Sequence, residues 1–145
     1  MLNQDFKEFA ELLNARGVEY LVVGGYALAV HGHPRYTGDI DFWLCPEAGN
    51  IAKLLEALKA FGFAALELGV ADFGPDAVIQ LGQPPRRIDL LTSVDGVSFR
   101  ACYDRREVVD VSGVLLNFIG LEDFKANKRA SGRHKDLADL DCLED

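Results

Sequence analysis

The chain has 145 residues, 49% of them hydrophobic and 26% charged, which are ordinary values for a single globular domain over residues 1–145. Its net charge of -8 argues against broad, sequence-independent binding to nucleic acid, because such binding neutralises many phosphates. The chain shows neither an apolar run long enough to span a bilayer nor the start of a secretory signal, so we expect a cytoplasmic protein with no membrane partner.

Hydrophobic spacing and turn residues predict helices and strands in mixed order along the chain. Apolar residues at helical spacing mark the first and third helices, and Gly17 and Gly62 are well placed to end them. In chain order, we expect a helix at 3–16, a strand at 19–23, a helix at 26–30, a loop at 31–38, a strand at 39–44, a helix at 46–61, strands at 77–81, 87–92, 107–111 and 114–118, and helices at 121–130 and 133–143.

The order of these elements predicts the fold class. Several strands are joined through helices, and Ser112-Gly113 is suited to the short turn of a hairpin between the last two strands. We therefore expect an α/β (α+β) fold with a mixed sheet backed by helices.

Acidic and apolar residues alternate in the strand expected at 39–44. Asp39 and Asp41 are two positions apart, so their carboxylates share one face and lie roughly 6–7 Å apart, while Ile40 and Phe42 face the core. Like charges this close raise each other's pKa unless a cation or a proton neutralises them. Mg²⁺ favours such carboxylates together with water and substrate phosphates, which predicts a nucleoside triphosphate site. The alternative is a solvated strand face or a helix-capping acid.

A third acid, Asp89, lies among apolar residues in the strand expected at 87–92. Its side chain points away from the buried side of the strand and can complete a metal site with the first two acids. The alternative is a surface residue on an edge strand.

Gly24-Gly25 joins the strand expected at 19–23 to the following helix. Glycine pairs usually provide tight turns. At the start of a helix, they also allow phosphates to approach free amide groups. Both interpretations stay open on these residues alone.

The combination of these features is more specific than its parts. Residues 23–27, Val-Gly-Gly-Tyr-Ala, and residues 35–42, Arg-Tyr-Thr-Gly-Asp-Ile-Asp-Phe, resemble the signature of the DNA polymerase β-like nucleotidyltransferase superfamily, especially its small bacterial and archaeal members. Residues 127–140 also resemble the tail of AbiEii-like toxin nucleotidyltransferases. The resemblance touches most of the chain.

The resemblance implies roles for particular residues. Gly24 and Gly25 would touch the triphosphate, Asp39 and Asp41 would hold two Mg²⁺ ions, and Asp89 would bind the second ion and assist the incoming hydroxyl. Many transferring members carry serine at the position of Gly25, so this chain lacks that hydroxyl contact to phosphate.

Basic residues near the carboxyl end of an otherwise acidic chain are suited to phosphate binding. The resemblance selects Lys128 and Arg133 for this role, with a solvated helix face as the alternative. Arg35 and Thr37 precede the acidic pair and are further candidates for orienting phosphate or metal ligands.

Other polar and aromatic residues have simpler explanations. His31 and His33 form a His-x-His pair, but no further His or Cys is near enough in the sequence to favour a metal site. Asp136 and Asp139 share a helical face and indicate an ion-pair network, and Trp43 is more often a packing residue than a base-stacking one.

The leading hypothesis from the resemblance is a magnesium-dependent nucleotidyltransferase. It would move a nucleoside monophosphate from a nucleoside triphosphate to a hydroxyl of a protein, an RNA or a small molecule, as a toxin paired with a cognate antitoxin. Because the chain is close to a bare catalytic core, we expect acceptor recognition to need a partner or self-association. The alternative hypothesis, motivated by Gly25, is a catalytically weak or inactive nucleotide-binding or protein-interaction module of the same fold.

Overall fold

The computed structural model describes residues 2–33, 37–62 and 67–144 and has a mixed α/β architecture. Its strands form one six-stranded sheet in the order β3-β4-β2-β1-β6-β5. In chain order, the elements are α1 (Gln4–Ala15), β1 (Tyr20–Val23), α2 (Gly24–Val30), β2 (Asp39–Leu44), α3 (Ala48–Phe61), the 3-10 helix η2 (Val70–Phe73), β3 (Val78–Leu81), β4 (Arg87–Leu91), α4 (Phe99–Asp104), β5 (Glu107–Val111), β6 (Val114–Phe118), α5 (Leu121–Ser131) and α6 (His134–Leu143).

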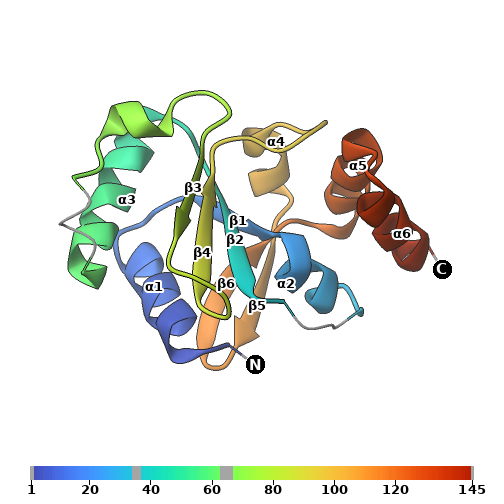
Figure 1. Cartoon of the computed structure of the whole chain (residues 1–145), viewed down its shortest axis with the longest axis horizontal. Helices are drawn as coiled ribbons and strands as arrows, with labels where there is room; N and C mark the ends of the chain where they lie inside the picture. Colours follow the sequence, from blue (N-terminus) through green and yellow to red (C-terminus); the bar gives the residue numbers. More distant parts are fainter. Residues whose placement is uncertain (1, 34–36, 63–66, 145) are drawn as a thin grey trace.

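The helices lie on both sides of this sheet. Figure 1 shows α1 and α3 on one side, and α2, α4, α5 and α6 on the other. The expected fold class is therefore confirmed. No described helix has the length and apolar character needed to cross a membrane.

Strand β2 lies near the middle of the sheet and has two chemically different faces. Ile40 and Phe42 are fully buried, and the ring of Phe42 packs edge-on against Phe9 of α1 with centroids 5.4 Å apart. Asp39 and Asp41 point to the opposite face and are only partly buried. The strand is therefore apolar towards α1 and α3 and acidic towards α2, as its alternation predicts.

The sheet register aligns three strands at the acidic face. Strand β2 runs antiparallel to β1 and parallel to β4, and Asp41 is paired with Val23 on one side and Asp89 on the other. Because Gly24 follows Val23 directly, the glycine pair and the acids on two strands meet at the same edge of the sheet.

Local sequence signals explain most element boundaries. Asn3 caps α1 by accepting a hydrogen bond from the Phe6 amide at 2.9 Å, and Gly62 ends α3 with a left-handed φ of 110°. The expected hairpin is also confirmed, since Ser112 and Gly113 both have positive φ in the turn between β5 and β6.

The structure corrects the predicted elements in detail. Helix α3 begins at Ala48 rather than at Pro46, and α2 already includes Gly24 and Gly25. The short helices η2 and α4 have no counterpart among the predicted elements, because four and six residues are too few for a helical period to stand out.

Candidate active site

Three acids meet on the acidic face of the sheet. Asp39, Asp41 and Asp89 each offer a carboxylate oxygen, and these oxygens all lie within 4.8 Å of one another. Asp89 is 6% exposed, whereas Asp39 and Asp41 are intermediate. The expected convergence follows from the register, because parallel pairing sets Asp41 directly beside Asp89.

This cluster carries more negative charge than its surroundings compensate. Burial, followed by repulsion from Asp39, raises the pKa of Asp41 to about 8. Burial also raises the pKa of Asp89, although hydrogen bonds from Arg87 and Asp41 oppose the shift. Burial acts in the same direction on Asp39, but hydrogen bonds from Asp89, Thr37, Asp41 and Arg87 outweigh it and lower the pKa of Asp39. In the absence of a metal, one carboxyl of the cluster therefore holds a proton at neutral pH.

Arg87 is the cation that faces this cluster from within the sheet. Its Nε donates to Asp89 Oδ1 at 2.9 Å, and its Nη2 lies 3.1 Å from both Asp39 Oδ2 and Asp89 Oδ2. This role was not among those predicted from the sequence. The signal was present, since Arg87 and Asp89 are two positions apart on one strand and must share a face.

The glycine pair is packed against the acids and the segment before them. Gly24 has a φ of 69°, and a Cβ placed on it would collide with the Asp41 carboxylate. Thr37 lies over Gly25, and its hydroxyl is 3.0 Å from Asp39 Oδ1 and 3.1 Å from the Asp39 carbonyl oxygen. Arg35, the other candidate from this segment, lies outside the described residues.

The basic residues selected at the carboxyl end are held by carboxylates. Lys128 is buried, and its Nζ lies 3.1 Å from Asp136 Oδ1 and 3.2 Å from Asp139 Oδ2. Arg133 donates from Nε to Asp136 Oδ2 at 2.7 Å, but most of its side chain is exposed. The expected ion-pair network around Asp136 and Asp139 is present, so the charge of Lys128 is already paired.

Asp136 is ionised within this network. Burial alone would raise its pKa, but hydrogen bonds from Ser131, Arg133 and Lys128 outweigh burial and lower the pKa of Asp136 to about 2. Its carboxylate therefore fixes the junction of α5 and α6 at all ordinary pH values.

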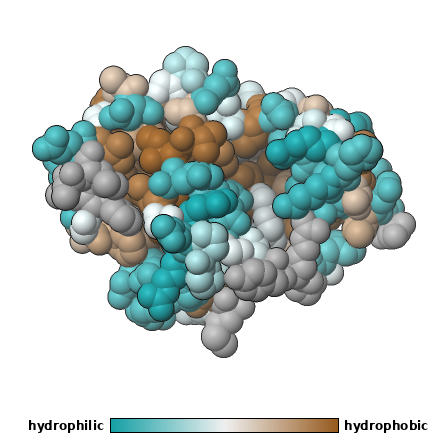
Figure 2. Space-filling view, viewed as in Figure 1, coloured by the Kyte–Doolittle hydropathy of each residue, from teal (hydrophilic) through white to brown (hydrophobic). Residues whose placement is uncertain are grey.

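A cleft lies between the acidic face of the sheet and this junction. It consists of two adjoining hollows of about 380 and 460 Å³, each within the range of roughly 300–1,000 Å³ that ligand sites occupy. The smaller hollow is polar and includes Gly25, Thr37, Asp39 and Lys135. The larger one adds the apolar side chains of Val78, Leu91 and Val94. Figure 2 shows the polar surface over α5 and α6 and apolar surface on the side of β3.

The three acids beside this cleft, Asp39, Asp41 and Asp89, fit a divalent cation. Oxygen ligands from three carboxylates suit Mg²⁺, and Arg87, which contacts Asp39 and Asp89, supplies a single positive charge. A divalent ion in place of the proton would remove this excess charge.

His31 and Trp43 have structural roles instead. His31 Nε2 is 2.8 Å from the Ile119 carbonyl oxygen, and its Nδ1 is 3.5 Å from Glu107. Trp43 is buried and packs edge-on against Phe99. Packing, rather than base stacking, therefore accounts for Trp43.

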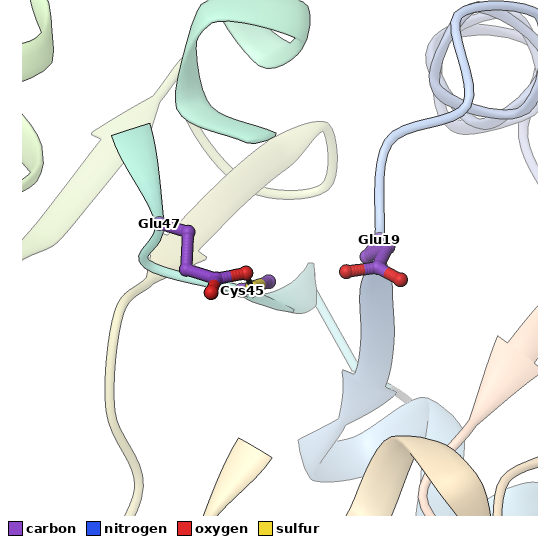
Figure 3. Close-up of side chains that lie close together, drawn as sticks. All are labelled: Glu19, Cys45 and Glu47. Carbon is purple, nitrogen blue, oxygen red and sulfur yellow. Dashed lines mark hydrogen bonds between the residues drawn. The ribbon is translucent and has the colours of Figure 1, made fainter. Parts of the chain in front are cut away.

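A second group of possible metal ligands lies at the opposite end of β1 and β2. Figure 3 shows Glu19, Cys45 and Glu47 close together, and their ligand atoms also lie within 4.8 Å of one another. Arg100 lies beside this group, with Nη2 2.8 Å from Glu19 Oε1 and 3.7 Å from Glu47 Oε2, so one of the group's two carboxylate charges is balanced. Hydrogen bonding to Arg100 lowers the pKa of Glu19, and burial raises the pKa of Cys45. The raised pKa of the thiol makes its thiolate, the form that binds metals, less accessible than in an ordinary cysteine.

Comparison with protein families identifies the fold and the superfamily. A family model described as "nucleotidyltransferase of unknown function (DUF6036)" matches residues 1–143. The chain belongs to this family. The assignment supports the predicted nucleotidyltransferase superfamily for nearly the whole chain.

One solved structure resembles this nucleotidyltransferase family member along most of its length. It is the crystal structure of an antigenic nucleotidyltransferase-like protein from Paracoccidioides brasiliensis, with a TM-score of 0.54 and 16% sequence identity. The match covers 98% of this chain and 77% of that one, and at this identity it shows the fold alone. No curated protein matches the chain.

Proposed function

We propose that this family member is a magnesium-dependent nucleotidyltransferase, acting in the cytoplasm through a single domain over residues 1–145. It transfers a nucleoside monophosphate from a nucleoside triphosphate to a hydroxyl group. The observation that carries the proposal is the convergence of Asp39, Asp41 and Asp89 beside Gly24, in a cleft that also receives basic side chains.

The metal site would consist of these three acids. Asp39 and Asp41 would hold two Mg²⁺ ions, with Asp89 as a ligand of the second. Ions held by these acids would supply stabilisation of the attacking and leaving oxygens of an in-line displacement. Burial and repulsion from Asp39, which together raise the pKa of Asp41, support this assignment, because a bound cation would relieve both.

The triphosphate would occupy the polar hollow. Gly24 and Gly25 allow close approach of the backbone, and the exposed guanidinium of Arg133 faces the same space. Lys128 contributes less charge than the resemblance implies, because Asp136 and Asp139 already pair it. We therefore expect Arg133 to bind phosphate and Lys128 chiefly to hold α5 and α6 together beside the cleft.

The chemical step is a displacement at the α-phosphorus. The oxygen of the acceptor hydroxyl forms a bond to the α-phosphorus, the bond from that phosphorus to the oxygen bridging the α- and β-phosphates breaks, and pyrophosphate leaves with the bonding electrons. Asp89, the carboxylate on the neighbouring strand, would receive the hydroxyl proton.

The acceptor is a hydroxyl of a protein, an RNA or a small molecule, recognised together with a partner or a second copy of the chain. The likeness of residues 127–140 to AbiEii-like toxins supports a toxin paired with an antitoxin. If so, expression of the intact chain should arrest growth, and an Asp41→Asn chain should not. Equal growth with both chains would contradict the toxin role but would leave the proposal of nucleotidyl transfer intact.

The direct test uses each α-³²P-labelled triphosphate with Mg²⁺ and a cell extract as the source of acceptors. We expect the intact protein to label a component that is then assigned by protease or ribonuclease digestion. Asp39→Asn and Asp41→Asn should each reduce labelling by at least about 1,000-fold, because electrostatic stabilisation at the reacting phosphate is a large part of such catalysis. Labelling that persists in both variants would contradict the assignment.

The second candidate function is a nucleotide-binding or interaction module without turnover, which the glycine at position 25 favours. Calorimetric titration separates the two candidates. Tight binding of a triphosphate with Mg²⁺, without labelling in any extract, would favour the module.

A further inference from the structure

The side-chain space of Gly25 is occupied by Thr37. A Cβ placed on Gly25 would lie 3.0 Å from both Cβ and Oγ1 of Thr37 and 3.3 Å from its Cγ2. These separations are shorter than ordinary van der Waals contacts. Gly25 does not have the positive φ that Gly24 has, so its backbone conformation alone does not require glycine. A Cβ at position 25 would therefore need Thr37 to shift by a few tenths of an ångström, which favours glycine there.

Thr37 arrives at this position from another part of the chain. It lies just before β2, whereas Gly25 is in the first turn of α2. The hydroxyl group therefore reaches the start of α2 from the β2 side, at a point where Gly25 itself offers no side chain.

The Thr37 hydroxyl has two acceptors in reach but one hydrogen. Its Oγ1 is 3.0 Å from Asp39 Oδ1 and 3.1 Å from the Asp39 carbonyl oxygen. A hydroxyl donates one hydrogen at a time and its rotor can turn. When Asp39 Oδ1 is committed to a cation, the hydroxyl hydrogen can be donated to another oxygen in the cleft.

The acceptor available in the cleft would be a phosphate oxygen. Thr37 lines the polar hollow together with Asp39, Arg133 and Lys135, so its hydroxyl shares one space with the acids and with two basic side chains. A triphosphate whose α-phosphate reaches the acids and whose outer phosphates reach Arg133 or Lys135 would occupy that space.

We propose that Thr37 is a triphosphate-binding residue that donates its hydroxyl hydrogen to a β- or γ-phosphate oxygen, and that Gly25 is glycine to make room for it. This inference rests on the proposed function. It identifies the residue that supplies the hydroxyl missing from position 25.

The test measures binding without turnover. Each of the four nucleoside triphosphates is used as its α,β-methylene analogue, in which nucleotidyl transfer is blocked, and is titrated calorimetrically with Mg²⁺ present. Thr37→Val removes the hydroxyl and keeps the shape of the side chain, whereas Thr37→Ser keeps the hydroxyl. We expect Thr37→Val to weaken binding of the best analogue about tenfold and Thr37→Ser to stay within about threefold of the intact protein.

A role limited to orienting Asp39 would give a different pattern. In that case Thr37→Val would weaken binding of Mg²⁺ alone and of the matching nucleoside monophosphate as much as binding of the triphosphate analogue. Our inference requires both of these to change by less than about twofold, because neither involves a β- or γ-phosphate. An equal loss for all three ligands, or no loss for the triphosphate analogue, would overturn it.

An exchange of the two side chains tests the shared space. Gly25→Ser alone should weaken analogue binding at least about tenfold, because the new Cβ meets Thr37. Adding Thr37→Gly should recover most of that loss, since a hydroxyl returns and the contact is relieved. If the loss of binding free energy in the double variant equalled the sum of the losses in Gly25→Ser and Thr37→Gly, the exchange would be contradicted. If the intact protein bound none of the four analogues, the proposed function itself would be wrong, which is a separate outcome.

Discussion

The two ends of β2 each carry a group of possible metal ligands, but their charge is balanced differently. At one end, Arg100 contacts both Glu19 and Glu47, and its hydrogen bond to Glu19 lowers the pKa of that carboxyl. At the other, Arg87 faces three carboxylates, and the pKa of Asp41 is raised to about 8. Proximity of acids alone therefore does not mark a site. The acidic cluster is distinguished by three carboxylates facing one arginine beside an open cleft.

The largest effect is expected from a substitution that displaces one of the three acids without replacing it. Gly24→Ala places a Cβ against the Asp41 carboxylate. The backbone at position 24 has a φ of 69°, which alanine adopts less readily than glycine. We expect transfer to fall by about 100-fold or more, because small displacements of reacting groups have effects of this size. Radiolabel transfer measures it.

Gly49→Ala is the matched control for this substitution. Gly49 lies in α3, has no atom within 4 Å of an added Cβ and lacks a positive φ. Transfer by this variant should match that of the intact protein. If both variants lost activity equally, crowding of Asp41 would not be the cause.

The raised pKa of Asp41 predicts that protons and metal compete. Below about pH 8, Asp41 is protonated, so affinity for Mg²⁺ should fall about tenfold for each pH unit as pH decreases. Titration calorimetry in buffers of different ionisation enthalpy should detect release of about one proton per metal ion at pH 7. An affinity for Mg²⁺ that does not change between pH 6 and pH 8 would contradict the raised pKa of Asp41.

The same pKa also sets the direction of a stability change. The pKa of Asp41 is raised in the folded state above the ordinary 3.8 of the unfolded chain, so the folded state binds the proton more tightly. Its stabilising contribution is full below about pH 4 and is lost as pH rises through about 8. The metal-free protein should therefore melt at progressively lower temperature across that range, and Asp41→Asn should reduce the dependence. Thermal melts between pH 4 and pH 9 measure this effect.

A smaller effect is expected from the cation at the acidic cluster. Arg87→Met removes the guanidinium that contacts Asp39 and Asp89, which leaves the carboxylates more repulsive. We expect a lower melting temperature without metal and an affinity for Mn²⁺ that is about threefold to tenfold higher, because a competing cation has been removed. Arg86→Met is the control, since Arg86 is exposed and contacts only Asp5 among the described ion pairs. Weaker Mn²⁺ binding in Arg87→Met would mean that Arg87 chiefly orders the ligands.

The smallest effect concerns the opposite end of β2. Glu47→Gln changes a largely exposed side chain whose described ion pair is the 3.7 Å contact with Arg100. Nucleotidyl transfer and Mn²⁺ affinity should stay within about twofold of the intact protein, as is usual for exposed ion pairs. A larger loss of metal binding would show that this second group takes part.

Sequence patterns were sufficient for the parts of the site that depend on local periodicity. The alternation of Asp39 and Asp41 with buried residues, and the single acid Asp89 in an apolar strand, predicted which side chains share a face. Their meeting depends on parallel pairing of β2 with β4, which no local pattern specifies.

Long-range partners explain what sequence reasoning missed. Lys128 lies in the last turn of α5, where a lysine is usually exposed, yet it is buried and paired with Asp136 and Asp139 of α6. The reason for Gly25 was equally hidden, because it lies in the side chain of Thr37 from another segment. Such contacts between elements are set by packing rather than by spacing along the chain.

Binding of Mn²⁺ to the two acidic groups tests the central claim most directly. Electron paramagnetic resonance of free Mn²⁺ would be followed during titration of the intact protein, an Asp41→Asn/Asp89→Asn variant and a Glu19→Gln/Glu47→Gln variant. We predict that the first double substitution abolishes the high-affinity binding and that the second leaves it within about twofold. Binding that survives loss of Asp41 and Asp89 but disappears with Glu19 and Glu47 would contradict the account.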